Sequence, residues 1–62
     1  MNNMKEIRVS HGTRKLIMDY FNVTYPTVRK ALRYNTNSVT ALAIRAYALE
    51  HGGWLVRLER FE

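Results

Sequence analysis

The 62-residue sequence predicts a mainly α fold: a three-helix, helix-turn-helix bundle whose short terminal β-strands pair as a ribbon. Apolar residues recur at three- and four-residue spacings through the middle of the chain, as in helices that pack on a core. Helix-capping and helix-stopping residues divide this middle region into three segments. Both ends of the chain alternate between apolar and polar residues, as half-buried strands do. We expect one domain over residues 1–62, with a small core and no disulfide, because the chain has no cysteine.

The first strand is expected over residues 5–9, where "KEIRV" places Ile7 and Val9 on one face. The first helix is expected over about 13–21, with Thr13 as its cap. Its apolar stripe consists of Leu16, Ile17, Tyr20 and Phe21. Asn22 ends this helix, because asparagine tolerates the left-handed conformation of a tight turn.

The second helix is expected over residues 25–33, and it contains a proline near its start. Thr24 is the predicted N-cap, with its hydroxyl accepting from a free backbone N–H of the first turn. Pro26 then occupies the second helical position, where the missing amide has no partner within the helix. The residues expected to turn inward are Val28, Ala31 and Leu32.

The third helix is expected over residues 38–51, capped by Ser38 and stopped by Gly52-Gly53. Its residues available for burial are Val39, Leu42, Ala43, Ala46, Tyr47 and Leu49. The last strand is expected over about 54–60. Tyr20, Phe21 and Tyr47 are expected in the core, and Trp54 belongs either to the core or to a contact between copies.

The positive charge of the chain lies in its first half. The formal net charge is +5. Residues 1–33 carry seven Lys or Arg against two acidic residues, a net +5, and residues 34–62 carry three against three, a net zero. Such an asymmetry favours a polyanionic partner, and ordinary solubility charge is the alternative.

The segment "NVTYPTVRKAL" (Asn22–Leu32) resembles the helix-turn-helix of the lactose-repressor-like or Cro-like repressor headpiece. The second helix of that family commonly reads Val-Ser-x-x-Thr-Val-Ser-Arg. The matching residues here are Val23, Thr24, Thr27, Val28 and Lys30. Asn22 replaces the usual glycine of the turn, and Met18 replaces a small residue where the two helices approach. The resemblance runs from about Thr13 to Gly52, and the terminal strands have no place in that headpiece.

The resemblance implies sequence-specific binding of double-stranded DNA by a small prokaryotic or phage-type transcriptional regulator, with helix 25–33 in the major groove. The residues expected to read bases are Tyr25, Pro26, Arg29 and Lys30. The residues expected to contact the DNA backbone are Arg14, Lys15, Thr24, Thr27, Arg33, Asn35 and Asn37. A solvated helix face is the alternative for Arg29, Lys30 and Arg33, and packing on a neighbouring helix is the alternative for Tyr25.

Other functional classes find little support in the sequence. The acidic residues form no recognisable catalytic pair, and no glycine-rich phosphate loop is present, so we expect no enzyme. His11 and His51 lack metal-ligand spacing, so we expect neither a metal nor a cofactor. No apolar run approaches the roughly 18 residues that span a bilayer, and no secretory segment starts the chain, so a cytoplasmic protein without membrane contact is expected. No effector-binding domain follows, so no small-molecule effector is expected.

Two copies of the chain could join as a homodimer through strands 5–9 or 54–60 and so place two helices on a palindrome. Two further hypotheses remain. A ribbon-helix-helix protein would place strand 5–9 of two chains in the groove. A non-enzymatic protein-interaction module would direct its basic face to an acidic protein.

Overall fold

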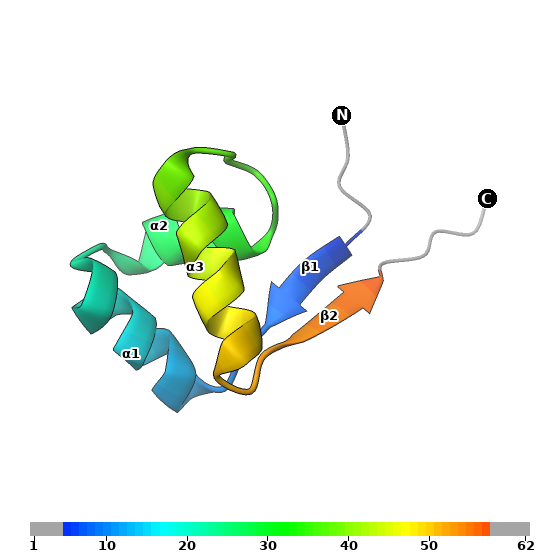
Figure 1. Cartoon of the computed structure of the whole chain (residues 1–62), viewed down its shortest axis with the longest axis horizontal. Helices are drawn as coiled ribbons and strands as arrows, with labels where there is room; N and C mark the ends of the chain where they lie inside the picture. Colours follow the sequence, from blue (N-terminus) through cyan, green and yellow to red (C-terminus); the bar gives the residue numbers. More distant parts are fainter. Residues whose placement is uncertain (1–4, 58–62) are drawn as a thin grey trace.

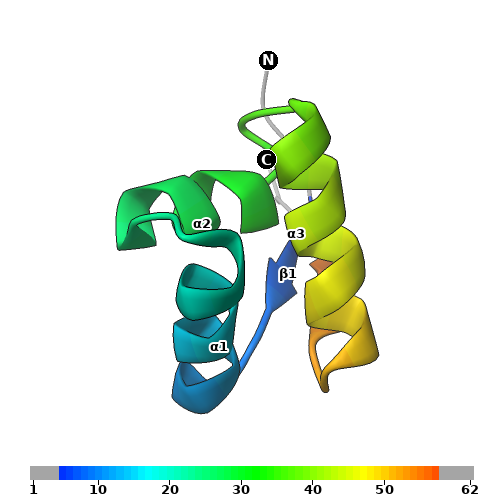
Figure 2. The ribbon, with the colours of Figure 1, turned by 60° about the vertical axis from the view of Figure 1, so that its left-hand side comes forward.

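The computed structural model describes residues 5–57, and over these residues it confirms a mainly α fold with a ribbon of terminal strands. The elements follow in the order β1 (Lys5–Arg8), α1 (His11–Phe21), α2 (Tyr25–Leu32), α3 (Val39–Glu50) and β2 (Trp54–Arg57). The ribbon extends beside the helices (Figure 1). In the turned view, α1 and α2 lie on one side and α3 on the other (Figure 2). No helix within residues 5–57 is long and apolar enough to cross a bilayer.

The ribbon is formed by the two ends of one chain. β1 and β2 are antiparallel, in a register that places Ile7 opposite Leu55 and Arg8 opposite Trp54. β1 has four residues and ends one residue before the predicted end. β2 is described over Trp54–Arg57, and residues 58–60 of the predicted last strand lie outside the described residues. Directly opposed residues face the same side of a ribbon. Ile7 is buried, so the face of the ribbon that carries Ile7 packs toward the helices. Arg8 and Trp54 lie together on the opposite face of the ribbon.

The helix starts follow the sequence with two corrections. Ser10, not Thr13, caps α1: the Thr13 N–H donates to the Ser10 hydroxyl at 3.2 Å, and the Thr13 hydroxyl donates to the His51 carbonyl at 3.1 Å. Thr24 is the N-cap of α2, but its hydroxyl accepts no backbone hydrogen bond; it lies 3.2 Å from the Thr27 hydroxyl instead. Ser38 caps α3 as predicted and accepts from the Ala41 N–H at 3.1 Å. Ser and Thr side chains near a helix start can each bond backbone groups there, so a sequence can offer more than one candidate cap.

All three helices end in the same way. A backbone N–H beyond each helix donates to a carbonyl five residues earlier: Val23 to Met18 at 3.1 Å, Asn35 to Lys30 at 2.9 Å, and Gly53 to Ala48 at 2.8 Å. This six-residue closure is typical of the Schellman motif, whose preceding residue is left-handed. Those residues are Asn22 (φ 55°), Tyr34 (φ 63°) and Gly52 (φ 92°). The left-handed conformation predicted for Asn22 is confirmed.

The core joins one buried stripe from each helix to β1. Its residues are Ile7, Ile17, Val28, Ala31, Leu32, Ala41, Ile44 and Ala48. The inward face of α2 is therefore as predicted. The face predicted for α3 is wrong: of its six residues only Tyr47 packs against the core, and Ala41, Ile44, Arg45 and Ala48 are buried instead. α3 is apolar on almost every side, so periodicity alone could not select the buried side.

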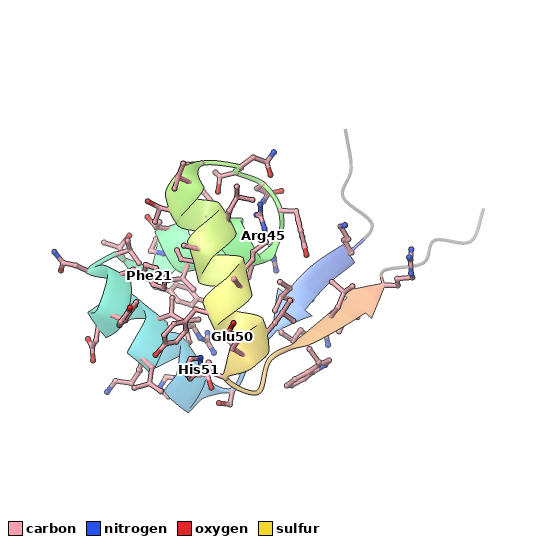
Figure 3. The ribbon with its side chains drawn as sticks, viewed as in Figure 1. Phe21, Arg45, Glu50 and His51 are labelled. Carbon is pink, nitrogen blue, oxygen red and sulfur yellow. The ribbon has the colours of Figure 1, made fainter. Side chains whose placement is uncertain are left out.

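An aromatic group joins α1 to α3 at the surface. Tyr20 was expected in the core, but it is 70% exposed and stacks on Tyr47, with ring centroids 5.0 Å apart. Phe21 and Tyr47 are half-buried against the core, as their predicted role requires. His51 stacks on Tyr47 at 3.9 Å, at the end of α3 (Figure 3). Because ring edges and faces can associate without full burial, a stripe of aromatic residues does not always mark the core.

Candidate nucleic-acid interface

α2 divides cleanly into an inward and an outward face. Val28 and Ala31 are essentially fully buried, and Leu32 is nearly so. All four residues expected to read bases remain exposed along the outward face: Tyr25, Pro26, Arg29 and Lys30. Pro26 occupies the first turn, as its missing amide requires. The helix thus presents an aromatic ring, an apolar ring and two cations to solvent on one side.

The turn from α1 into α2 is short and well defined. α1 ends at Phe21 and α2 begins at Tyr25. Asn22 supplies the left-handed residue, and Val23 and Met18 pack against the core on either side of the turn. The Met18 side chain is thus accommodated beside the turn. The repressor headpieces that this segment resembles have a small residue at that position. An unbranched thioether side chain adapts readily to such a gap.

Arg14 ties α1 to the start of α2. Its guanidinium carbon lies 5.1 Å from the centre of the Tyr25 ring, within the range of a cation–π contact. The Arg14 Nε is buried without a hydrogen-bond partner among the described residues. Tyr25 therefore packs on a neighbouring helix and still keeps 42% of its surface exposed. The packing given as the alternative for Tyr25 is therefore present, and its role in reading bases stays a prediction.

A groove of about 250 Å³ separates α2 from the ribbon. Four arginines line it: Arg8 from β1, Arg14 from α1, Arg29 from α2 and Arg33 directly after α2, with Trp54 at the ribbon side. Glu6 lies in the same groove, with its Oε2 2.7 Å from the Arg8 Nε and its Oε1 3.7 Å from the Arg33 Nε. The sequence did not assign Arg8 or Trp54 to the interface. The groove runs along β1 and is lined by Ile7 and Val9 as well as by Arg8, and no local signal in the sequence predicts that the ribbon lies beside α2.

The other predicted contact residues fall into three groups. Pro26, Arg29, Lys30, Arg33 and Asn35 line a second depression beside the end of α2. Lys15 on α1 and Thr24 and Thr27 at the start of α2 are exposed. None of the three lines either depression. Asn37 is engaged within the protein, because its Oδ1 accepts from the Arg45 guanidinium at 3.2 Å.

Arg45 holds the far end of α2 in place, and the sequence did not single it out. It is 7% exposed, and its Nη1 donates to the Ala31 and Thr36 carbonyls at 2.9 Å each. Figure 3 shows it on α3 beside the loop that follows α2. Its guanidinium also lies 4.5 Å from the centre of the Tyr34 ring, which Lys5 approaches at 4.7 Å. Arg45 is a structural cation, so its charge does not add to the basic surface.

The arrangement can bind a polyanion over one continuous face. Exposed cations extend from the ribbon across the groove to the outward side of α2, and the acidic Glu6 is already paired with arginine. Among residues 5–57, no three His, Asp or Glu side chains gather where they could hold a metal ion.

Comparisons with protein-family models, with curated proteins and with solved structures gave no match.

Proposed function

We propose that the protein binds double-stranded DNA in a sequence-specific manner, with α2 in the major groove, and acts as a small transcriptional regulator of a prokaryotic or phage type. The observation that carries this proposal is the division of α2, whose apolar side is buried while Tyr25, Pro26, Arg29 and Lys30 remain exposed. An α-helix fits the width of the major groove, and residues near its start reach base edges.

The proposal assigns a chemical role to Pro26 and to the basic residues on and around α2. Arg29 and Lys30 donate to the O6 and N7 of guanine, and Pro26 offers apolar contact to a thymine methyl group. Lys15, Arg14 and Arg33 contact phosphates and position the helix without reading sequence. Action on DNA places the protein in the cytoplasm.

The structure also suggests a role for the ribbon. Because Arg8 lines the same groove as Arg29, it can contact the phosphates beside the site that α2 occupies. This is a supporting role and differs from the ribbon-helix-helix hypothesis. In that hypothesis, β1 strands from two chains pair with each other, whereas here β1 pairs with β2 of its own chain.

The test is fluorescence anisotropy of duplexes selected from a random pool, measured over a salt series. We expect a preferred sequence and a slope of about −0.9 in log K against log salt for each phosphate contact. Lys30→Ala should remove the preference at one or more positions. Arg57→Ala is the charge-matched control, because Arg57 is exposed on β2 and lines neither depression beside α2.

A shallow salt slope without a preferred sequence would contradict the proposal. Equal losses from Lys30→Ala and Arg57→Ala would also contradict it, because they would show that charge alone drives binding. The basic face would then fit an acidic protein better than a DNA duplex.

A further inference from the structure

α3 carries a second apolar stripe on the side away from the core. Val39 is 83% exposed, Leu42 54% and Leu49 48%. Ala46 is also exposed and lies between the two leucines in the helix. These four residues follow a spacing of three, four and three, which is the a and d pattern of a coiled coil over two heptads. Nothing in residues 5–57 covers this stripe.

The stripe is accessible along its length. Figure 2 shows α3 at one flank of the molecule, with α1 and α2 on its other side. The core side of the same helix is formed by Ala41, Ile44 and Ala48, which are buried. A helix that is apolar on both sides needs two partners, and this chain supplies one.

We propose that the stripe Val39, Leu42, Ala46 and Leu49 is a dimer interface that binds the same stripe of a second copy, with the two α3 helices antiparallel. This inference does not depend on DNA binding. It also places the contact between copies on α3, whereas the sequence suggested the terminal strands, which pair with each other within one chain.

A second copy fits the charge of this face. The stripe is uncharged. α3 contains two charged side chains, Arg45 and Glu50, and neither belongs to the stripe. Arg45 is buried toward the core. Two chains with a net charge of +5 each repel one another through their basic surfaces. Association through the neutral flank keeps those surfaces apart, and a symmetric dimer requires only one self-complementary patch.

Side-chain size and charge favour the antiparallel orientation. In that orientation Leu42 faces the partner's Ala46, and Val39 faces the partner's Leu49, so that large residues meet small or branched ones. A parallel pair would place two Ala46 side chains opposite each other and leave a gap. Glu50 lies in the last turn of α3 (Figure 3), where an acidic side chain opposes the helix dipole. An antiparallel partner brings its N-terminus, whose first turn has no acidic residue, beside this carboxylate.

The interface is small, so the dimer should be weak. α3 has 12 residues and is about 18 Å long at 1.5 Å per residue. A single helix pair of this length falls at the low end of interface areas, below about 1,200 Å² in total, as in transient complexes. We therefore expect dimerisation to depend on concentration in the micromolar range or above.

Sedimentation velocity of the whole chain without DNA tests the interface. We expect the wild type to move from monomer toward dimer as its concentration rises to about 0.5 mM, a range that covers micromolar dissociation constants. Leu42→Glu should weaken the dimer roughly tenfold or more, because it places two carboxylates in the seam. Leu16→Glu is the matched control, since Leu16 is 51% exposed on α1. Circular dichroism checks that both variants keep their helices.

Cysteine cross-linking tests the orientation of the two helices. The chain has no cysteine of its own, so each introduced cysteine reports on one position. A mixture of Val39→Cys and Leu49→Cys chains should form a mixed disulfide dimer, and neither variant alone should do so. The two positions lie about 15 Å apart along one helix, whereas a disulfide needs Cα atoms about 4.4–6.8 Å apart.

Three outcomes would overturn the proposal. The first is a monomer throughout the concentration range. The second is a dimer that Leu42→Glu leaves unchanged, which would assign the contact to another surface such as a ribbon edge. The third is rapid cross-linking of each single variant alone, which would show a parallel pair. These experiments contain no DNA, so they test the dimer interface even if the protein does not bind a duplex.

Discussion

Gly53 is the position where we expect one added methyl group to destabilise the fold most specifically. A Cβ on Gly53 would lie 2.6 Å from the Ala48 carbonyl oxygen and 2.9 Å from a methyl group of Val9. The first of these atoms is backbone, so it cannot turn away. The Gly53 N–H donates to the same carbonyl at 2.8 Å, and relieving the clash would lengthen this hydrogen bond.

The magnitude follows from these two contacts. Inserting a methyl group into a packed region costs about 1–3 kcal/mol, and losing a backbone hydrogen bond costs about 1 kcal/mol. We therefore expect Gly53→Ala to lower the free energy of unfolding by about 2–4 kcal/mol. A core of this size supplies on the order of 3–5 kcal/mol in total, so the variant should be partly unfolded at room temperature.

Gly52→Ala is the matched comparison. Gly52 has a φ of 92°, and an added Cβ would meet nothing within 4 Å. Only the left-handed strain of about 1–2 kcal/mol is expected there. Urea unfolding followed by circular dichroism gives both free energies. If Gly52→Ala proved the more damaging of the two, the close approach at Gly53 would not be the constraint that we describe.

Two further predictions concern the ends of α2 and α3. Ser38→Ala should cost about 1 kcal/mol and Thr24→Ala much less, because the Ser38 hydroxyl accepts a backbone hydrogen bond and the Thr24 hydroxyl does not; equal losses in urea unfolding would refute this ranking. Arg45→Met should cost about 2 kcal/mol, since hydrogen bonds from a charged donor contribute about 1.5–3 kcal/mol each and the burial of the cation offsets part of them. An unchanged unfolding midpoint for Arg45→Met would show that the loop after α2 needs no such support.

Features that depend on neighbouring residues were predictable from the sequence. Pro26 marks the start of α2 because its chemistry is local, and Asn22 adopts the left-handed turn for the same reason. The inward side of α2 was also correct, because polar residues on its other side leave one choice. Strands were also found at Lys5–Arg8 and Trp54–Arg57, within the predicted ranges, but the sequence left open whether they pair within one chain, as they do, or between two.

Features that depend on distant residues were not predictable. The buried side of α3 could not be chosen, because that helix is apolar all round and alanine allows the closer approach. Arg45 entered the sequence analysis only as one of the three cations of residues 34–62, because its partners at Ala31 and Thr36 come together only in the folded chain. Arg8 joins the candidate interface only because the ribbon packs beside α2.

The shared ending of the three helices gives the molecule built-in reporters. The N–H groups of Val23, Asn35 and Gly53 each bond back into the preceding helix. Each of these hydrogens can exchange with solvent only when its own junction opens. Amide exchange at these three positions would therefore rank the junctions by stability. The amide of Val23 monitors the turn before α2, and that of Asn35 monitors the loop after it. Comparing them with and without a duplex would show which end of α2 tightens when the protein binds.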